Sequence, residues 1–316
     1  MKNYKVKNWM KALLSSCLVL VMVTGCKKDD DDGTESKTLS TVIAEDSDLS
    51  LLKYAIDKAN LTATLNTASL DYTVFAPTND AFTAAGLGTI AAIDTKTSTE
   101  LSFIILYHCL TAKTNASAIA TGDNSVTTMA TTETSYLSKK SNGDVFINGA
   151  KVTKADINCN NGVIHKINKV ILAAEDDIVE LAIANPDLSY LVAAVLRANV
   201  QGALSAAGPL TVFAPTNAAF IAAGFPSIAS INSADPTTLA AILTYHVVNS
   251  RAFSCDLTDG ASVATLNPGK NVTVNTTSGV QLSGIGNGGN KSNVTSADNL
   301  ATNGVVHIID RVLLPQ

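Results

Sequence analysis

The four histidines of this chain are the residues whose type and spacing could support chemistry, and they form two pairs, His108 with His165 and His246 with His307. Two neighbouring imidazoles could bind a metal ion or activate a nucleophile. A zinc site needs further ligands, however, and no cysteine stands at matching positions beside both pairs. We therefore favour a structural interpretation, in which each imidazole is buried and hydrogen-bonds across the core, and we predict no metal site and no cofactor.

Each pair combines a helical histidine with a strand histidine. Three apolar residues and then His108 occupy positions i, i+3, i+4 and i+7, and the same holds for His246. This spacing puts each imidazole on the buried face at the end of a helix, where it can hydrogen-bond the last carbonyls. His165 and His307 lie in apolar strands, and alternation along the strand places His165 on the inner face, opposite Lys166.

No other motif in the sequence can be assigned to a reaction. We find no Gly-x-Ser-x-Gly turn, no phosphate-binding loop and no pair of carboxylates that the sequence identifies as acting on a glycosidic bond. We therefore predict no catalytic residues and a non-enzymatic protein.

The five cysteines have different expected fates. Cys17 and Cys26 belong to the amino-terminal region, whereas Cys109 follows the helical histidine of the first pair and Cys159 precedes its strand histidine. If that pair meets in the core, Cys109 and Cys159 could form a disulfide, and the sequence leaves this open because it does not give the distance between their Cα atoms. Cys255 is then left as a free thiol.

The elements that position these residues occur twice. Residues 73–79, Thr-Val-Phe-Ala-Pro-Thr-Asn, are repeated as residues 211–217. Thr, Val and Phe favour a strand, Pro ends it, Thr and Asn are good helix N-caps, and Gly86 or Gly224 ends the short helix that follows. The chain is therefore an internal duplication built around a strand, a cap and a helix.

Further helices flank this device in both copies. Each copy opens with two short apolar helices, and Asp48 and Asp187 are placed to cap the second of them. The helix that ends at a histidine starts with a Thr97 to Glu100 capping box in the first copy and with Asp235 before proline in the second.

Short strands and turns follow each helical histidine. Asn-Gly pairs at 142–143 and 148–149 predict hairpins, and the second copy has a glycine-rich stretch at 284–289 in the corresponding region. Each copy closes with Asn-Gly and a long strand, at 161–172 and 303–314.

Composition bounds the class of protein. With 316 residues and 46% hydrophobic content, the chain is long enough for two globular domains. Its net charge of -5 would repel a phosphate backbone, so we predict no nucleic-acid partner.

The amino terminus is expected to be a targeting segment. Lysines precede an apolar run at 12–23 that is too short for a comfortable membrane span, and Val-Thr-Gly before Cys26 resembles the bacterial lipobox. We predict a lipoprotein signal peptide over 1–25 and lipid attachment at Cys26, with several acyl chains giving a stable membrane anchor. The alternative is an ordinary signal peptide that happens to contain a cysteine.

A charged segment follows the anchor. Two lysines and four aspartates at 27–32 cannot fold against themselves, so residues 26–38 are predicted to be an acidic, solvated tether. Lysine followed by acidic residues directly after the lipidated cysteine resembles the surface-export signal of Bacteroidota lipoproteins. The expected location is therefore the outer membrane, lipid-anchored and facing the cell exterior, although a simple spacer is the alternative.

Three repeated blocks together resemble the fasciclin domain family: the 73–79 stretch, the Tyr-His at the end of the third helix, and the closing Asn-Gly-Val strand with its histidine. The resemblance covers residues 39–316 and implies an α+β fold of two tandem fasciclin-like domains, 39–174 and 175–316. Each would be a β-wedge of about seven strands with several helices. The family's usual role is extracellular adhesion.

The resemblance also implies candidate binding positions. In animal members of the family, the Tyr-His region and an Asp-Ile pair before the closing strand are linked to integrin binding. The matching positions here are listed in chain order: Tyr107, His108, Asp156, Ile157, Tyr245, His246 and Asp298; Asn299 replaces the second isoleucine. If the histidines at these positions are buried, mutating them should more often unfold a domain than remove a contact with a binding partner.

Two functions of different classes follow. The first is a surface-anchored adhesion or extracellular interaction protein that binds an unknown surface protein or glycan without turnover. The second is a glycan-binding component of an outer-membrane polysaccharide-uptake system. A glycan platform usually needs exposed aromatic residues, and the only tryptophan, Trp9, lies in the leader, so the first is favoured.

Overall fold

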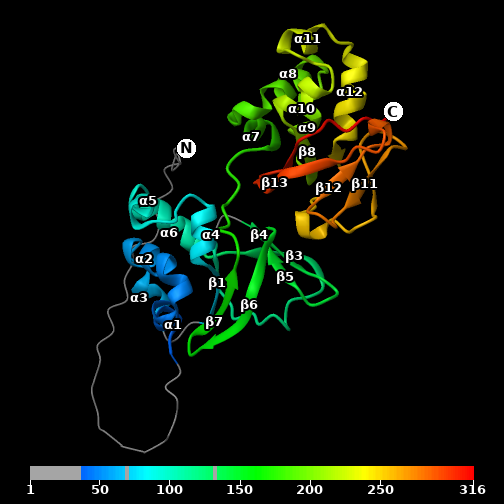
Figure 1. Cartoon of the computed structure of the whole chain (residues 1–316). Coiled ribbons are helices and arrows are strands. Elements are labelled where there is room, and N and C mark those ends of the chain that lie inside the picture. Colours follow the sequence, from blue (N-terminus) through cyan, green and yellow to red (C-terminus); the bar gives the residue numbers. More distant parts are fainter. Residues whose placement is uncertain (1–36, 68–70, 131–133) are drawn as a thin grey trace, which may run out of the picture. The chain divides into compact units, whose positions relative to one another are not determined.

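A computed structural model describes residues 37–67, 71–130 and 134–316, and these form two compact units (Figure 1). Cys26, the signal peptide and nearly all of the tether lie outside the described residues. Within the described ranges, no single helix is long and apolar enough to cross a bilayer, and one pair, Ile178–Ala184 with Pro186–Arg197, reaches that length and composition only across a 108° bend.

The first domain combines helices with a seven-stranded sheet in the order β2-β1-β7-β6-β5-β4-β3. Strand β1 runs parallel to β7, while β2 and β6 join them in antiparallel fashion. The elements are α1 (Leu39–Glu45), η1 (Ser47–Leu49), α2 (Ser50–Lys58), α3 (Thr62–Leu65), β1 (Tyr72–Pro77), α4 (Asn79–Ala84), α5 (Ile90–Asp94), α6 (Ser98–Tyr107), β2 (Cys109–Leu110), β3 (Gly122–Thr127), β4 (Thr134–Lys139), β5 (Val145–Ile147), β6 (Ala150–Cys159) and β7 (Gly162–Ile167).

The second domain repeats this arrangement, with the strand order β10-β11-β12-β13-β14-β8-β9. Its central strands β8 and β14 are again parallel. The elements are α7 (Ile178–Ala184), η2 (Pro186–Leu188), α8 (Ser189–Arg197), α9 (Gln201–Leu204), β8 (Leu210–Pro215), α10 (Asn217–Ala222), α11 (Ile228–Ser233), α12 (Pro236–Tyr245), β9 (Val247–Val248), η3 (Ser254–Asp256), β10 (Ser262–Ala264), β11 (Asn271–Asn275), β12 (Gln281–Ser283), η4 (Ile285–Asn287), β13 (Ser292–Ala301) and β14 (Gly304–Ile309). The predicted α+β class, with two seven-stranded domains, is confirmed.

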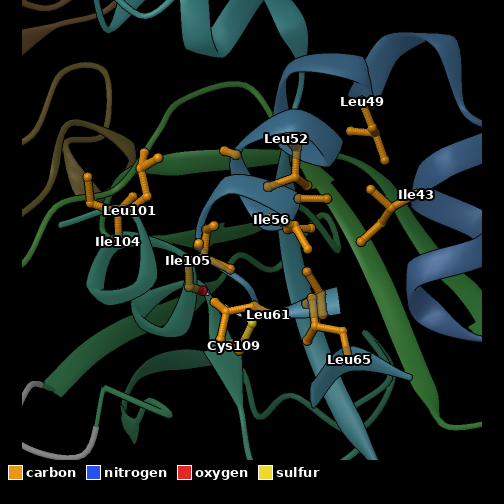
Figure 2. Packing of buried hydrophobic residues seen from close by; sticks show 14 of the residues in the cluster. Ile43, Leu49, Leu52, Ile56, Leu61, Leu65, Leu101, Ile104, Ile105 and Cys109 are labelled. Atoms are coloured by element: carbon orange, nitrogen blue, oxygen red, sulfur yellow. Dashed lines mark hydrogen bonds between the residues drawn. The ribbon is translucent and has the colours of Figure 1, made fainter. Parts of the chain in front are cut away.

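Apolar side chains from the helices form the main core of each domain against the central strands. In the first domain the cluster joins α1, α2 and α6 to β1 and β7. Figure 2 shows Ile43 of α1 pointing toward the side chains of α2, with Leu52 and Ile56 beside it. Burying such side chains contributes roughly 1.5 to 3 kcal/mol each, so the helices are held by packing more than by their short backbones.

The repeated 73–79 stretch ends a strand and starts a helix, as predicted. The Thr78 hydroxyl accepts a hydrogen bond from the N–H of Ala81 and caps α4, and Thr216 does the same for α10. Gly86 then adopts a φ of 75° and Gly224 a φ of 94°, a region that glycine enters without steric cost.

The asparagine of the same stretch caps a different helix from the one predicted. Asn79 is the first residue of α4, yet its Oδ1 accepts a hydrogen bond from the N–H of Leu51 at the start of α2, at 3.0 Å. Its Nδ2 donates to the carbonyl of Ser47, at 2.9 Å. Asn217 holds α8 in the same way, through the N–H of Tyr190 at 2.9 Å. The asparagine therefore joins two helices that are distant in sequence.

The caps predicted at Asp48 and Asp187 are wrong. Both residues lie inside a 3-10 turn that Asp46 or Asn185 caps by accepting their N–H groups. Asp48 instead contacts Lys166, whose ammonium lies 3.1 Å from it and 2.6 Å from Asp46. Lys166 is 7% exposed, so β7 is covered on both faces, and the expected contrast between an inner His165 and an outer Lys166 does not hold.

Other local predictions are confirmed, and four short helices were missed. Thr97 and Glu100 form the capping box of α6, and Asp235 caps α12 with proline at its first turn. Asn142-Gly143 and Asn148-Gly149 connect β4 to β5 and β5 to β6. The missed helices are α3, α5, α9 and α11, which are too short to show a helical period in the sequence.

The glycine-rich stretch of the second domain lies in the connection between β12 and β13, which pair antiparallel, so a hairpin is formed here too. Residues 285–287 form the 3-10 turn η4, and the Nδ2 of Asn287 donates to the carbonyl of Val312 at 2.8 Å. The loop therefore packs against the end of the chain.

Candidate functional site

The helical histidines lie at the ends of α6 and α12 and bond to their own helices. His108 is the C-cap of α6, with Nδ1 2.7 Å from the carbonyl of Ile104, and His246 is the C-cap of α12, with Nδ1 2.8 Å from that of Ile242. Both are buried, at 2% and 1% exposed. The predicted hydrogen bond to the last carbonyls is confirmed.

Burial keeps both rings neutral. The N–H of Leu313 donates to Nε2 of His246 at 2.9 Å, so that nitrogen is an acceptor and the ring proton sits on Nδ1. Desolvation lowers the pKa of His108 and of His246 from 6.5 to about 4. The lone pair of Nε2 in His246 is therefore occupied by the protein itself and is not offered to a metal or a substrate.

The strand histidines bridge two backbone segments. The N–H of Asp156 donates to Nδ1 of His165 at 3.1 Å, so Nε2 carries the proton and donates to the carbonyl of Thr114 at 2.9 Å. The ring packs on Phe75, with centroids 5.3 Å apart. Burial lowers the pKa of His165, against the opposing effects of the Thr114 bond and the Asp156 charge.

His307 repeats this geometry. Its Nδ1 accepts from the N–H of Asp298 at 3.3 Å, its Nε2 lies 2.9 Å from the carbonyl of Ala252, and its ring stacks on Phe213 with centroids 5.6 Å apart. Two domains that differ at most positions therefore keep one polar arrangement.

The two histidines of a domain lie on opposite sides of the first central strand. Phe75 donates its backbone N–H to the carbonyl of His108 at 2.9 Å, and across the parallel pairing it is the register partner of His165. The two histidines therefore lie on the two sides of β1 within the sheet, and the side chain of each has its own hydrogen-bond partners.

The aspartates of the implied Asp-Ile positions sit at bulges. Asp156 has a φ of 57° and Asp298 a φ of 62°, where the register between the last two antiparallel strands shifts. Oδ1 of Asp156 accepts from the N–H of Ala116 at 2.8 Å. Asp298 accepts from the N–H and the hydroxyl of Ser254, at 2.6 and 2.7 Å. Ile157 is half-buried against the core.

A threonine that the sequence did not suggest for this role completes the arrangement. Thr73 is buried, its hydroxyl donates to the carbonyl of Ala112 at 2.7 Å, and it accepts from the N–H of Thr114 at 2.8 Å. Thr211 makes the same two bonds to Ser250 and Ala252. The signal was present in the repetition of this threonine in both copies. We use the name loop clamp for the threonine, the strand histidine and the aspartate of a domain together with the loop that they hold. These residues are Thr73, His165 and Asp156 in the first domain and Thr211, His307 and Asp298 in the second.

The tyrosines beside the helical histidines are fully buried. Tyr107 and Tyr245 are both 0% exposed, and the hydroxyl of Tyr245 donates to the carbonyl of Asn271 at 2.7 Å while accepting from the N–H of Ile285 at 3.1 Å. These positions hold the domain together from the inside and do not form part of its surface.

The disulfide that the sequence left open is not formed. Cys109, Cys159 and Cys255 are free thiols, and Cys109 donates to the carbonyl of Ile105 at 3.2 Å. Burial raises the pKa of Cys109 to about 12 and that of Cys159 to about 11. Burial is also the main reason that the pKa of Cys255 is raised. Thiols with such pKa values are poor nucleophiles.

The hydrogen bonds of these polar groups hold backbone segments in place. In the parts of the chain that the structure describes, no group of three or more His, Cys, Asp or Glu side chains could hold a metal ion. Within each loop clamp the polar atoms named above are hydrogen-bonded to residues of their own domain.

Comparison with protein families identifies this construction. The sequence model of the Fasciclin domain matches residues 47–173 and 186–315. The chain belongs to the fasciclin domain family. It contains two such domains in tandem, each starting within the helices that precede the repeated strand and ending after the closing strand.

Relatives of this fasciclin pair include animal and bacterial proteins. The transforming growth factor-beta-induced protein ig-h3 of Sus scrofa is 30% identical over 244 residues, which is 77% of this chain but 35% of that protein. Human periostin is 27% identical over 77% of this chain and 28% of its own length. Protein sll1483 of Synechocystis is 44% identical over 140 residues, 44% of this chain and 73% of that protein. The chain thus spans about a third of the animal relatives.

A solved structure of a FAS1 domain pair from the insect cell adhesion molecule Fasciclin I also matches. It is 21% identical, with a TM-score of 0.42, and the match covers 84% of this chain and 95% of that one.

Proposed function

We propose that this protein is a non-enzymatic lipoprotein, anchored through Cys26 to the outer membrane and facing the cell exterior, that acts in cell adhesion or another extracellular interaction. The observation that best supports the proposal is that the polar residues most able to do chemistry are used inside the domains as loop clamps. Binding then falls to the loops and outer faces of the domains.

The family supports the adhesive part of the proposal. Fasciclin domain proteins are adhesion-related extracellular proteins, and the related proteins are non-enzymatic. The lipobox-like sequence before Cys26 and the lysines and aspartates at 27–32 support the surface location. The partner in this proposal is a surface protein or a glycan.

Whole-cell adhesion tests the proposal. A deletion strain should adhere less to its natural surfaces than the parent strain, and the chain from Ser36 to Gln316, added as soluble protein, should compete with the parent. A glycan array probed with the same soluble protein separates the two partner classes. Specific oligosaccharide binding without an adhesion defect in the deletion strain would replace adhesion by glycan capture.

A further inference from the structure

The second domain has an apolar pocket between α7 and α8. The cavity has a volume of about 60 Å³ and its lining, which includes Ala182, Leu191 and Val195, is almost entirely carbon. Ile183 and Leu196 also line it and are 60% and 59% exposed, so the pocket opens to solvent beside two exposed aliphatic side chains. Exposed large aliphatics next to one hollow are the usual mark of an interaction surface.

The first domain shows that the fold does not need this pocket. Helices α1 and α7 have seven residues each, and α2 and α8 have nine each, so their positions correspond one to one. Ala182 corresponds to Ile43, which is 1% exposed and fills the space between α1 and α2 (Figure 2). The loss of three carbons at this position accounts for the hollow.

The rim of the pocket is more apolar in the second domain than the corresponding surface of the first domain. In the first domain Lys53 and Asp57 form an ion pair at 2.7 Å, with side chains 48% and 46% exposed. Val192 and Leu196 stand at these two positions in the second domain. The second domain thus has a half-buried valine and the exposed Leu196 where the first domain has an exposed charge pair, although the charged version is compatible with the fold.

The size and the lining of the pocket select its occupant. A volume of about 60 Å³ is about twice the share of one water molecule in the liquid, which is room for the end of one branched aliphatic side chain. An apolar lining leaves a sugar hydroxyl without a partner, which is unfavourable. Aromatic rings occupy cavities nearer to about 150 Å³. An aliphatic side chain of a protein partner fits both requirements.

Charge around the pocket selects the flanks of that partner. Residues 175–187, which lead into and follow α7, contain five carboxylates and no lysine or arginine, and the second domain as a whole has ten acidic and five basic residues. A second copy of the same face would be repelled, as would an anionic lipid surface, whereas basic residues would be attracted.

We propose that the pocket between α7 and α8 binds a protein segment that inserts one leucine, isoleucine or valine side chain flanked by lysine or arginine. Ile183 and Leu196 cover the base of the inserted side chain, and the acidic α7 region orients the segment. This inference specifies a surface and a partner chemistry, and it stands independently of the proposed role in adhesion.

Two variants test the proposal, and both introduce residues that the first domain carries at the corresponding positions. Ala182→Ile fills the hollow as Ile43 does, and it should raise the unfolding temperature while blocking the pocket. The double variant Val192→Lys with Leu196→Asp restores the charge pair of α2, and it should fold normally. Ile221→Asp serves as the control, because Ile221 is 51% exposed on α10 and does not line the pocket.

The probe is a random peptide library displayed on phage and selected on the chain from Ser36 to Gln316, which keeps both domains whole. The selected peptides should share one aliphatic residue next to lysine or arginine. Titration calorimetry with the synthetic winners should show at least tenfold weaker binding to each of the two pocket variants and unchanged binding to Ile221→Asp. Replacing the aliphatic residue of the peptide by alanine should also cost at least tenfold.

Several results would overturn the proposal. They include a library that yields no pocket-dependent peptide, or winners that bind the Ala182→Ile variant as tightly as the parent. If the parent protein self-associates in sedimentation experiments and the double variant does not, the pocket binds a second copy of the chain. Co-sedimentation with phosphatidylglycerol vesicles that the same variant abolishes would assign it to lipid. The peptide-binding assay contains no cells, so a negative result in it would not count against the proposed role in adhesion.

Discussion

At the scale of the residue, histidine and aspartate serve here to fix backbone in place. His165 and His307 each connect a bulged strand to a loop through both ring nitrogens. The loop segments that they hold are irregular and contain backbone groups that need partners once buried. Side chains that accept on one atom and donate on another satisfy these groups in pairs, which explains why the same residue types recur in both domains.

Burial of neutral His108 and His246 makes the protein less stable in mild acid. Below about pH 6.5 the unfolded chain takes up a proton at each imidazole, whereas the folded rings, with a pKa of about 4, do not. The stability that they contribute is present above pH 6.5 and is lost progressively between pH 6.5 and 4, by about 3 kcal/mol for each ring. Urea unfolding followed by circular dichroism at stepped pH measures this loss.

A variant that cannot titrate provides the control for this pH effect. His246→Gln lowers stability at every pH but should give a shallower decline between pH 6.5 and 4. An equal decline in the variant and the parent would show that His246 does not cause it.

Asp298 is predicted to matter for folding and not as a contact. Asp298→Ala removes the acceptor of two hydrogen bonds from Ser254 and forces alanine to a φ of 62°. We expect the free energy of unfolding of the second domain to fall by roughly 2 to 4 kcal/mol. Asp298→Asn tolerates this φ better and keeps one acceptor, so it should lose clearly less. An Asp298→Ala protein with the parent's unfolding midpoint would make the carboxylate a candidate binding group again.

At the scale of the element, helices in this fold are capped by residues that lie far away in sequence. Asn217 begins α10 but caps α8, and Asn303 precedes β14 but accepts from the N–H of Ile178 at the start of α7, at 3.0 Å. Gly304 after it lets β14 approach β8, since a Cβ there would lie 2.1 Å from the carbonyl oxygen of Leu210. The Asn-Gly pair therefore does more than form the turn that its sequence indicates.

Loss of such a long-range cap should cost as much as loss of a local one. Asn217→Ala removes the acceptor for the N–H of Tyr190 and the donor to Pro186, and the expected decrease in the free energy of unfolding is about 1 to 2 kcal/mol. Thr216→Ala, which removes only the ordinary cap of α10, is the matched comparison and should cost about 1 kcal/mol. Chemical denaturation of both variants measures this, and an unchanged midpoint for Asn217→Ala would exclude the capping role.

At the scale of the whole molecule, the proposed anchor and the two domains have separate tests. Cys26→Ala removes the only acceptor of the proposed lipid, so incorporation of labelled fatty acid should stop. Label that persists in this variant would refute the lipid anchor. Cys255→Ala is the control and should be labelled as the parent is.

Surface export is tested by removing the charged segment. A chain without residues 28–32 should keep its lipid but face the periplasm, so that protease added to intact cells no longer cleaves it. Unchanged cleavage would assign these residues to a spacer.

The sequence by itself determined the parts of this protein that depend on local rules. The repetition of residues 73–79 gave the duplication, and the cap at Thr97, the turns at Asn-Gly pairs and the helix-end histidines followed from backbone chemistry that acts within a few residues. Only the tertiary structure decided what the side chains of Asn79, Asp48 and Thr73 bond to, because their partners are 28 to 118 positions away in the chain. The same holds for the pocket beside Ala182, since a missing side chain becomes a hollow only where neighbouring helices cannot close around it.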